Sequence, residues 1–235
     1  MYLAYRAAYG NTQPFPNPDP GNPTEANKLP NYDVFSTDRP RVLGGATLAQ
    51  QQLAFTSQFV ARPEFGSRYG AGLNTGALFV DAVLANIQAA DGATFSSGDR
   101  TTLINHYNNA GGGNAGRALV MWHLSNDYWN TCSGAAPCVP GGFGAAVDNR
   151  AFIDAEYNRQ FALILYFGYL RRNPEIAGFI FWQGKINEAP VRNVPKQNSL
   201  VCSFITSGEY QLRFGPGTTF GTGLLFPRSN AECPP

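Results

Sequence analysis

The sequence predicts a mainly α-helical protein: an array of helical repeat units with long Gly/Pro loops and an extended C-terminal tail. Three observations carry this prediction. Apolar residues recur at helical spacing through much of the chain. A short aromatic motif occurs twice. Glycine and proline, with 26 and 17 residues, are frequent between the helical stretches and predict long loops there.

The repeated motif spans residues 59–70 and 204–215, at an offset of 145 residues. Each copy predicts the end of one helix and a short second helix, in which Glu and Arg four residues apart share a face while two aromatic residues pack inward. A final Gly ends the helix, because Gly accepts the left-handed conformation. The copies comprise Phe59, Glu64, Phe65, Arg68 and Gly70, and Phe204, Glu209, Tyr210, Arg213 and Gly215. A weaker third copy at residues 122–128 would complete an array of three units.

The remaining helices follow from apolar periodicity and from end signals. Ser96 with Asp99 is a capping pattern, and Thr75 precedes another apolar run. Arg171 and Arg172, followed by Asn173-Pro174, end the longest predicted helix. Helices are expected over residues 1–10, 46–61, from Thr75 onward, from Ser96 through Tyr107, and over 115–128, 149–172, 177–187 and 196–206.

The loops suggest the domain organisation. The Gly/Pro/Cys-rich stretch 131–147 is the best candidate boundary, which gives two repeats in residues 1–147, the best-matching repeat in 148–215 and an extended tail in 216–235. Within the first part, residues 11–40 form a Pro-rich loop without periodicity. A loop of this length is an interaction surface or a solvated excursion, and the sequence leaves both open.

The composition of the chain limits the kinds of partner that it can bind. Charged residues make up only 14% of the chain and the formal net charge is +1, so there is no basic surplus to neutralise nucleic-acid phosphates. No apolar run reaches the length of a membrane-spanning helix. The chain opens as if in the middle of a helix and lacks a signal peptide, which suggests a fragment or a processed form.

The four cysteines predict two disulfides. Cys132 and Cys138 flank a loop of small residues that a local bridge could close, and a Cys202–Cys233 bridge would tie the tail to the body. The spacing of the first pair, with no adjacent His, is poor for zinc. An even count in a Gly/Pro-rich chain favours an oxidising compartment, and the alternative is four free thiols.

Candidate catalytic and binding residues are few. His106 and His123 lack a nucleophile elbow, so no triad is predicted, and His123 is expected to be a packing or surface residue. The oxygen-rich segment 91–99 lacks calcium-loop spacing, so a capped turn is favoured over calcium binding. Glu64 and Glu209 could form an acid–base pair, although each has an Arg at helical spacing. We expect no metal and no cofactor.

Aromatic residues in the C-terminal half allow two interpretations. They could line a sugar site, or they could be the core side of helices. The residues concerned are Tyr166, Tyr169, Phe179, Phe181 and Trp182.

Residues 152–215 carry a family resemblance. The run Tyr166 to Glu175, then Gly178 and Trp182, then the motif from Phe204, resembles domain of unknown function 4214, which is found in bacterial secreted and surface proteins. Residues 1–70 resemble a second copy in which the Pro-rich loop replaces the Gly-x-x-x-Trp turn. The resemblance implies an all-α fold, an extracellular or surface-attached location and no known catalytic residues.

Taken together, these features predict a non-enzymatic extracellular structural protein whose partner is itself, as a self-assembling subunit of a surface filament, tube or matrix. The alternative is an adhesin or a carbohydrate-binding accessory module that recognises surface glycans. No constellation of residues favours an enzyme.

Overall fold

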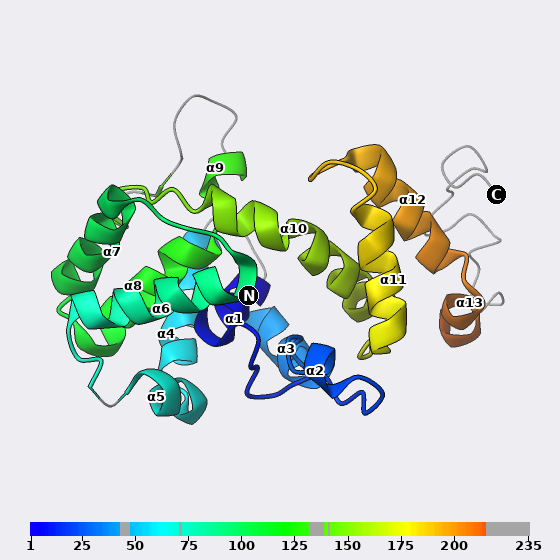
Figure 1. Ribbon diagram of the computed structural model, residues 1–235, viewed down its shortest axis with the longest axis horizontal. Helices are drawn as coiled ribbons and strands as arrows, with labels where there is room; N and C mark the ends of the chain where they lie inside the picture. Colours follow the sequence, from blue (N-terminus) through cyan, green and yellow to red (C-terminus); the bar gives the residue numbers. More distant parts are fainter. Residues whose placement is uncertain (43–47, 71, 132–138, 141, 215–235) are drawn as a thin grey trace. The chain divides into compact units, whose positions relative to one another are not determined.

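The computed structural model describes residues 1–42, 48–70, 72–131, 139–140 and 142–214 (Figure 1). As predicted, these residues are mainly α-helical. Backbone packing divides the chain into two compact units: unit 1 comprises residues 1–16 and 27–156, and unit 2 comprises residues 17–26 and those from 157 onward. The division falls inside a helix, after the loop at 131–147 that the sequence suggested as a boundary.

Unit 1 is built around its first helix. α1 is buried along its whole length and packs against α6 and α8 (Figure 1). It consists mostly of Ala, Tyr and Leu, and a helix that is apolar all round belongs in a core. The described helices of unit 1 are α1 (Tyr2–Tyr9), α3 (Tyr32–Asp38), η1 (Arg39–Val42), α4 (Leu48–Val60), α5 (Pro63–Tyr69), α6 (Gly76–Asp91), α7 (Ser97–Asn109), α8 (Gly113–Ser125), α9 (Tyr128–Thr131) and the start of α10 (Arg150–Leu165).

The first motif copy supplies the aromatic centre of this core. Phe59 meets the edge of Tyr5 at a centroid distance of 5.0 Å and that of Phe65 at 5.7 Å. Phe65 and Tyr69 are 4.8 Å apart, so their predicted inward packing is confirmed. Gly70 ends α5 with a right-handed φ of −78°, however, so the predicted left-handed cap is wrong here.

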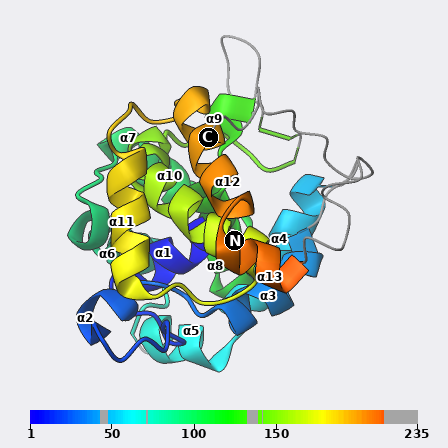
Figure 2. The same cartoon turned by 90° about the vertical axis from the view of Figure 1, so that its right-hand side faces the viewer.

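Unit 2 contains α2 (Pro23–Ala26), the later part of α10, η2 (Tyr166–Leu170), α11 (Ile176–Ile186), α12 (Val194–Ile205) and α13 (Gly208–Phe214). α12 packs against α11, η2 and α13 (Figures 1 and 2). The predicted helix 149–172 is not α-helical throughout, because residues 166–170 form a π-helix and Arg171 stops it at a φ of 50°.

The Pro-rich loop holds structure that periodicity could not reveal. It contains α2, α3 and η1, and Asn31 caps α3 by accepting a 2.8 Å hydrogen bond from Asp33 N. Its middle segment belongs to unit 2, where Asp19 accepts a 2.6 Å hydrogen bond from the N–H of Ile176 at the start of α11. Residues 17–26 thus supply the N-terminal cap that α11 lacks in its own flanking sequence. This role differs from both interpretations of the loop made from the sequence, an interaction surface or a solvated excursion.

Candidate functional site

The second motif copy and the residues before it form a small pocket in unit 2, which we call the Trp182 pocket. Its cavity volume is about 120 Å³. η2, α11, α12 and α13 each contribute to it. Its walls are Tyr166, Leu170, Arg172, Trp182, Ser203, Phe204, Ser207 and Glu209.

Three aromatic rings form one wall of the Trp182 pocket. Phe204 meets Tyr166 edge-on at a centroid distance of 5.1 Å and lies 5.1 Å from Trp182. The predicted motif residues Trp182 and Phe204 are therefore brought together, although 22 positions separate them in sequence. This arrangement needs Gly178, because a Cβ there would lie 2.5 Å from the Tyr166 hydroxyl.

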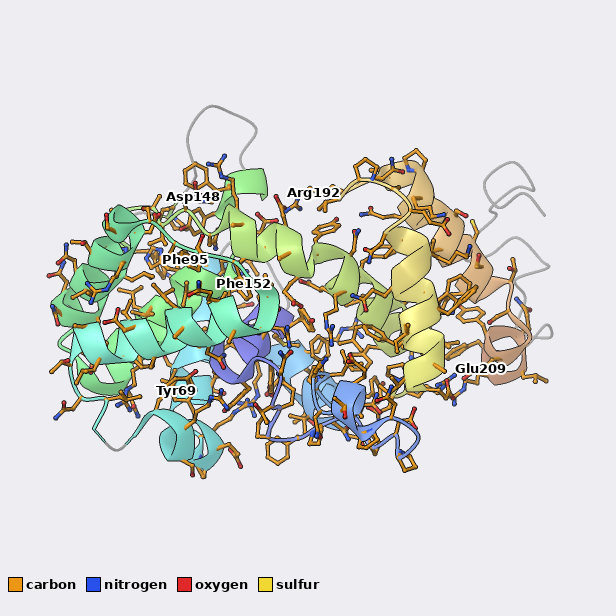
Figure 3. All side chains as sticks on the ribbon, in the orientation of Figure 1. Tyr69, Phe95, Asp148, Phe152, Arg192 and Glu209 are labelled. Carbon is orange, nitrogen blue, oxygen red and sulfur yellow. The ribbon has the colours of Figure 1, made fainter. Side chains whose placement is uncertain are left out.

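A charged pair, Arg172 and Glu209, also lines the Trp182 pocket. Arg172 Nη2 donates to Glu209 Oε2 at 2.6 Å, and Arg172 Nη1 lies 2.8 Å from Glu175 Oε2. Arg213 Nε lies 3.2 Å from Glu209 Oε1, which confirms the predicted helical pair. The hydrogen bonds from Arg172 hold the pKa of Glu209 below its usual value, so the carboxylate is ionised at neutral pH. Figure 3 places Glu209 near the N-terminal end of α11.

Tyr166 is the buried polar group of the Trp182 pocket. Its side chain is 3% exposed, and the Arg172 guanidinium lies 5.3 Å above its ring. Burial, with a smaller contribution from Glu175, raises the pKa of Tyr166 to about 12, so the hydroxyl keeps its proton.

The short helix of the second copy is capped as the sequence predicted, although none of its residues is buried. Ser207 Oγ accepts a 3.2 Å hydrogen bond from Tyr210 N and caps α13. The rings of Tyr210 and Phe214 contact each other at a centroid distance of 4.9 Å, tilted by 45°. Arg213 also donates to the carbonyl of Leu170 at 2.9 Å, which ties α13 to η2. Gly215 lies outside the described residues.

The first copy makes a different set of contacts. Arg68 donates to Asn86 Oδ1 at 2.6 Å instead of pairing with Glu64, so that predicted ion pair is wrong. Arg62 takes the polar role, donating to Asp38 at 2.6 Å and to the Tyr5 hydroxyl at 2.7 Å. Here the aromatic residues are fully buried, and the motif closes a core instead of bordering a pocket.

The two histidines pack against each other inside unit 1. The rings of His106 and His123 stack at 3.9 Å with an interplanar angle of 4°. Their Nε2 atoms lie 2.8 and 2.7 Å from the carbonyls of Ala145 and Phe143. Of the two roles that the sequence left open for His123, packing or surface, the structure shows packing, because the side chain is buried.

A second surface in unit 2 is the outer face of α11, formed by Ala177, Ile180, Phe181 and Gly184 at helical spacing. Ile180 and Phe181 are 46% and 54% exposed. The opposite side of α11 is also apolar, with Ile176, Phe179 and Ile186 buried. α11 is thus apolar on both its buried and its exposed side. A helix that is apolar on both sides is typically covered by other protein on both sides.

The five aromatic residues considered for a sugar site separate in the structure. Tyr166 and Trp182 line the Trp182 pocket, and Phe179 is buried beneath Arg159. Phe181 lies on the outer face of α11, while Tyr169 contacts Tyr210 at 6.3 Å.

Most of the cysteines that were predicted to form disulfides lie outside the described residues. Cys202 is buried on α12. Cys132, Cys138 and Cys233 lie outside the described residues, so both pairings stay predictions. The predicted tail 216–235 lies outside them as well.

Within the described ranges, no group of three or more His, Cys, Asp or Glu is placed to hold a metal ion. None of the helices described is both long and apolar enough to cross a membrane. Comparison of the chain with family models, with curated proteins and with solved structures gives no match in any of the three. The resemblance to domain of unknown function 4214 therefore stays a prediction from the motif residues.

Proposed function

We propose that the chain is a non-enzymatic extracellular structural protein that assembles with copies of itself. The outer face of α11 is the observation that carries this proposal. Burying two large apolar side chains that are half exposed favours association by about 25 cal/mol per Å² of apolar surface removed from water.

The face is also shaped to pair with itself. Its two large residues, Ile180 and Phe181, lie between the small residues Ala177 and Gly184 along the helix. When two copies meet about a twofold axis, the same patch is used on both, and large side chains of one copy can fill the space above small residues of the other. The occupant of the outer face is thus a second copy of the chain.

Analytical ultracentrifugation over a concentration series tests self-assembly. We expect the wild-type chain to associate and Phe181→Gln to remain monomeric at the same concentrations, with an unchanged circular dichroism spectrum. Leu212→Gln is the matched control, because Leu212 on α13 is even more exposed (86%) but lies off this face. A wild-type chain that stays monomeric throughout the series, or equal assembly by both variants, would refute the proposal.

The extracellular location rests on the cysteines. Intact-mass measurement before and after reduction checks it: two disulfides should add about four hydrogens, as expected for a protein of an oxidising compartment. Unchanged mass would indicate free thiols and argue against secretion.

A further inference from the structure

Independently of self-assembly, we infer that the stacked rings of His106 and His123 are an acid-sensitive latch, which holds the segment 142–147 over Trp122 at neutral pH and releases Phe143 in acid. The latch lies inside unit 1, where the segment leads into α10. Its release is a local change, distinct from unfolding of the unit.

The two rings bind alternate carbonyls of the segment. His123 on α8 donates to the carbonyl of Phe143 at 2.7 Å, and His106 on α7 donates to that of Ala145 at 2.8 Å. Between these two residues the backbone passes close to the histidines, because a Cβ on Gly144 would lie 2.6 Å from His106 Cε1. The position of the segment therefore depends on both rings, and imidazole is the side chain that titrates in mildly acidic solution.

These hydrogen bonds determine where an added proton must go. A carbonyl only accepts, so the Nε2 atom of each ring already carries its hydrogen. Nδ1 is then the atom that takes up a proton in acid. In His123 this atom is buried and has no hydrogen-bond partner among the described residues. A proton there would be a buried donor without an acceptor, which is unfavourable while the segment stays closed.

The surroundings of the rings do not stabilise a positive charge. Burial lowers the pKa of both histidines, and His106 lowers that of His123 further, while the bonded carbonyls oppose this only in part. From α9, the Tyr128 ring lies 6.1 Å from His123 and is neutral, because burial raises its pKa to about 12. The carboxylates of Asp99 and Asp148 act on Tyr128 and are not among the influences on either histidine. Protonation therefore favours a form in which the rings separate and reach water.

Release of Phe143 uncovers Trp122. The two rings stack at a centroid distance of 4.5 Å and an interplanar angle of 24°, and Trp122 is 1% exposed. Trp122 also lines a cavity of about 270 Å³ together with Leu48 and Tyr128. The open form thus exposes an aromatic surface that borders an existing cavity.

The end of the segment should remain in place. The carbonyl of Val147 accepts hydrogen bonds from the Tyr128 hydroxyl and, at 2.9 Å, from Trp129 Nε1. Neither donor titrates between neutral pH and pH 4, so this attachment persists in acid. Trp129 is therefore a stationary reference beside the part that moves.

Fluorine NMR of the full chain labelled with 5-fluorotryptophan tests the inference, because the chain has three tryptophans: Trp122 under Phe143, Trp129 at Val147, and Trp182 in unit 2. We expect the signal of a solvent-exposed Trp122 to grow between about pH 6.5 and about pH 4. Trp129, Trp182 and the circular dichroism spectrum should stay unchanged. With two rings taking up protons, the ratio of open to closed form should rise by up to about 100-fold per pH unit.

His106→Gln and His123→Gln each leave one titrating ring, so this rise should fall to at most about tenfold per pH unit. Gln is the conservative replacement, because its amide can donate to the same carbonyl without titrating. The double variant should show no opening. Opening that persists in the double variant, a concerted change of all three tryptophan signals, or a Trp122 signal that stays constant down to about pH 4 would each overturn the inference.

Discussion

Arg6 and Glu156 form a buried ion pair that joins α1 to α10 within unit 1. Arg6 Nη2 donates to Glu156 Oε1 at 2.9 Å, and the two side chains are 1% and 3% exposed. The same guanidinium nitrogen donates to Asp91 at the end of α6, and the Tyr2 hydroxyl donates to the other Glu156 oxygen. One cation therefore faces two carboxyl groups where water is scarce, so removing the cation should destabilise unit 1.

Replacing Arg6 by methionine should destabilise unit 1 by roughly 3–5 kcal/mol, because the buried Glu156 carboxylate loses its counter-charge. Urea unfolding followed by circular dichroism measures this. Arg100→Met is the matched control: Arg100 pairs with Asp81 at 2.6 Å, but both side chains are exposed, so we expect a change below about 1 kcal/mol. Similar losses in the two variants would contradict this account of the cluster.

Asp91 should make stability fall with rising pH. Burial, and next the Glu156 carboxyl, raise its pKa above the usual value, outweighing Arg6. Folded Asp91 therefore holds a proton that the unfolded chain releases above about pH 4. This stability is present at low pH and is lost as the pH rises through the folded pKa, by up to about 1.4 kcal/mol per pH unit.

Urea unfolding of the wild type and of Asp91→Asn from about pH 5 to about pH 9 tests this, because Asn carries no titrating proton. The variant should show a flatter profile. Asp81→Asn should leave the profile unchanged, since the hydrogen bond from Arg100 lowers the pKa of Asp81 and it is ionised throughout this range. Parallel profiles for the wild type and Asp91→Asn would refute the prediction.

His123 should make the protein sensitive to acid. Burial, with the neighbouring His106 ring, lowers its pKa to about 3, whereas an unfolded histidine titrates near 6.5. Between these values the unfolded state binds more protons, so stability falls as the pH drops. His123→Gln should lose less melting temperature than the wild type between about pH 7 and about pH 4. Since the pKa of His106 is also lowered, some sensitivity should remain.

Gly178 should be intolerant of a methyl group. Gly178→Ala places a Cβ 2.5 Å from the Tyr166 hydroxyl, and such overpacking costs roughly 1–3 kcal/mol. Gly184→Ala in the same helix meets nothing within 4 Å and should gain up to about 1 kcal/mol in monomer stability. Combining Gly178→Ala with Tyr166→Phe removes the clashing oxygen, so the free energy of unfolding in urea should return towards the wild-type value. If the double variant is as unstable as Gly178→Ala alone, the Tyr166 hydroxyl is not the clashing group.

Local signals in the sequence predicted most of the helices. Ser96 and Asp99 form the expected capping box, and Thr75 accepts from Leu78 N at 3.3 Å as a cap should. The pairs Phe65–Tyr69 and Tyr210–Phe214 follow from helical spacing alone. In each case the interacting residues lie within one turn, where a pattern can show them.

Contacts between distant segments could not be predicted in this way. The Asp19 cap on α11 joins positions that share no periodicity, and the stacking of His106 on His123 depends on how α7 meets α8. The Trp182 pocket was only partly foreseen. Its aromatic residues were recognised, whereas Arg172 was expected to end a helix and instead reaches Glu209 on α13.

The capping of α11 by the Pro-rich loop determines how late unit 2 can finish folding during synthesis. Asn17 and Asp19 bond to Pro174 and Ile176, partners that follow 157 residues later in the chain. At translation rates of about 5–20 residues per second, residues 17–26 are synthesised roughly 8–30 s before their partners. Unit 2 therefore cannot be completed until the ribosome has passed α11, however early its first segment emerges.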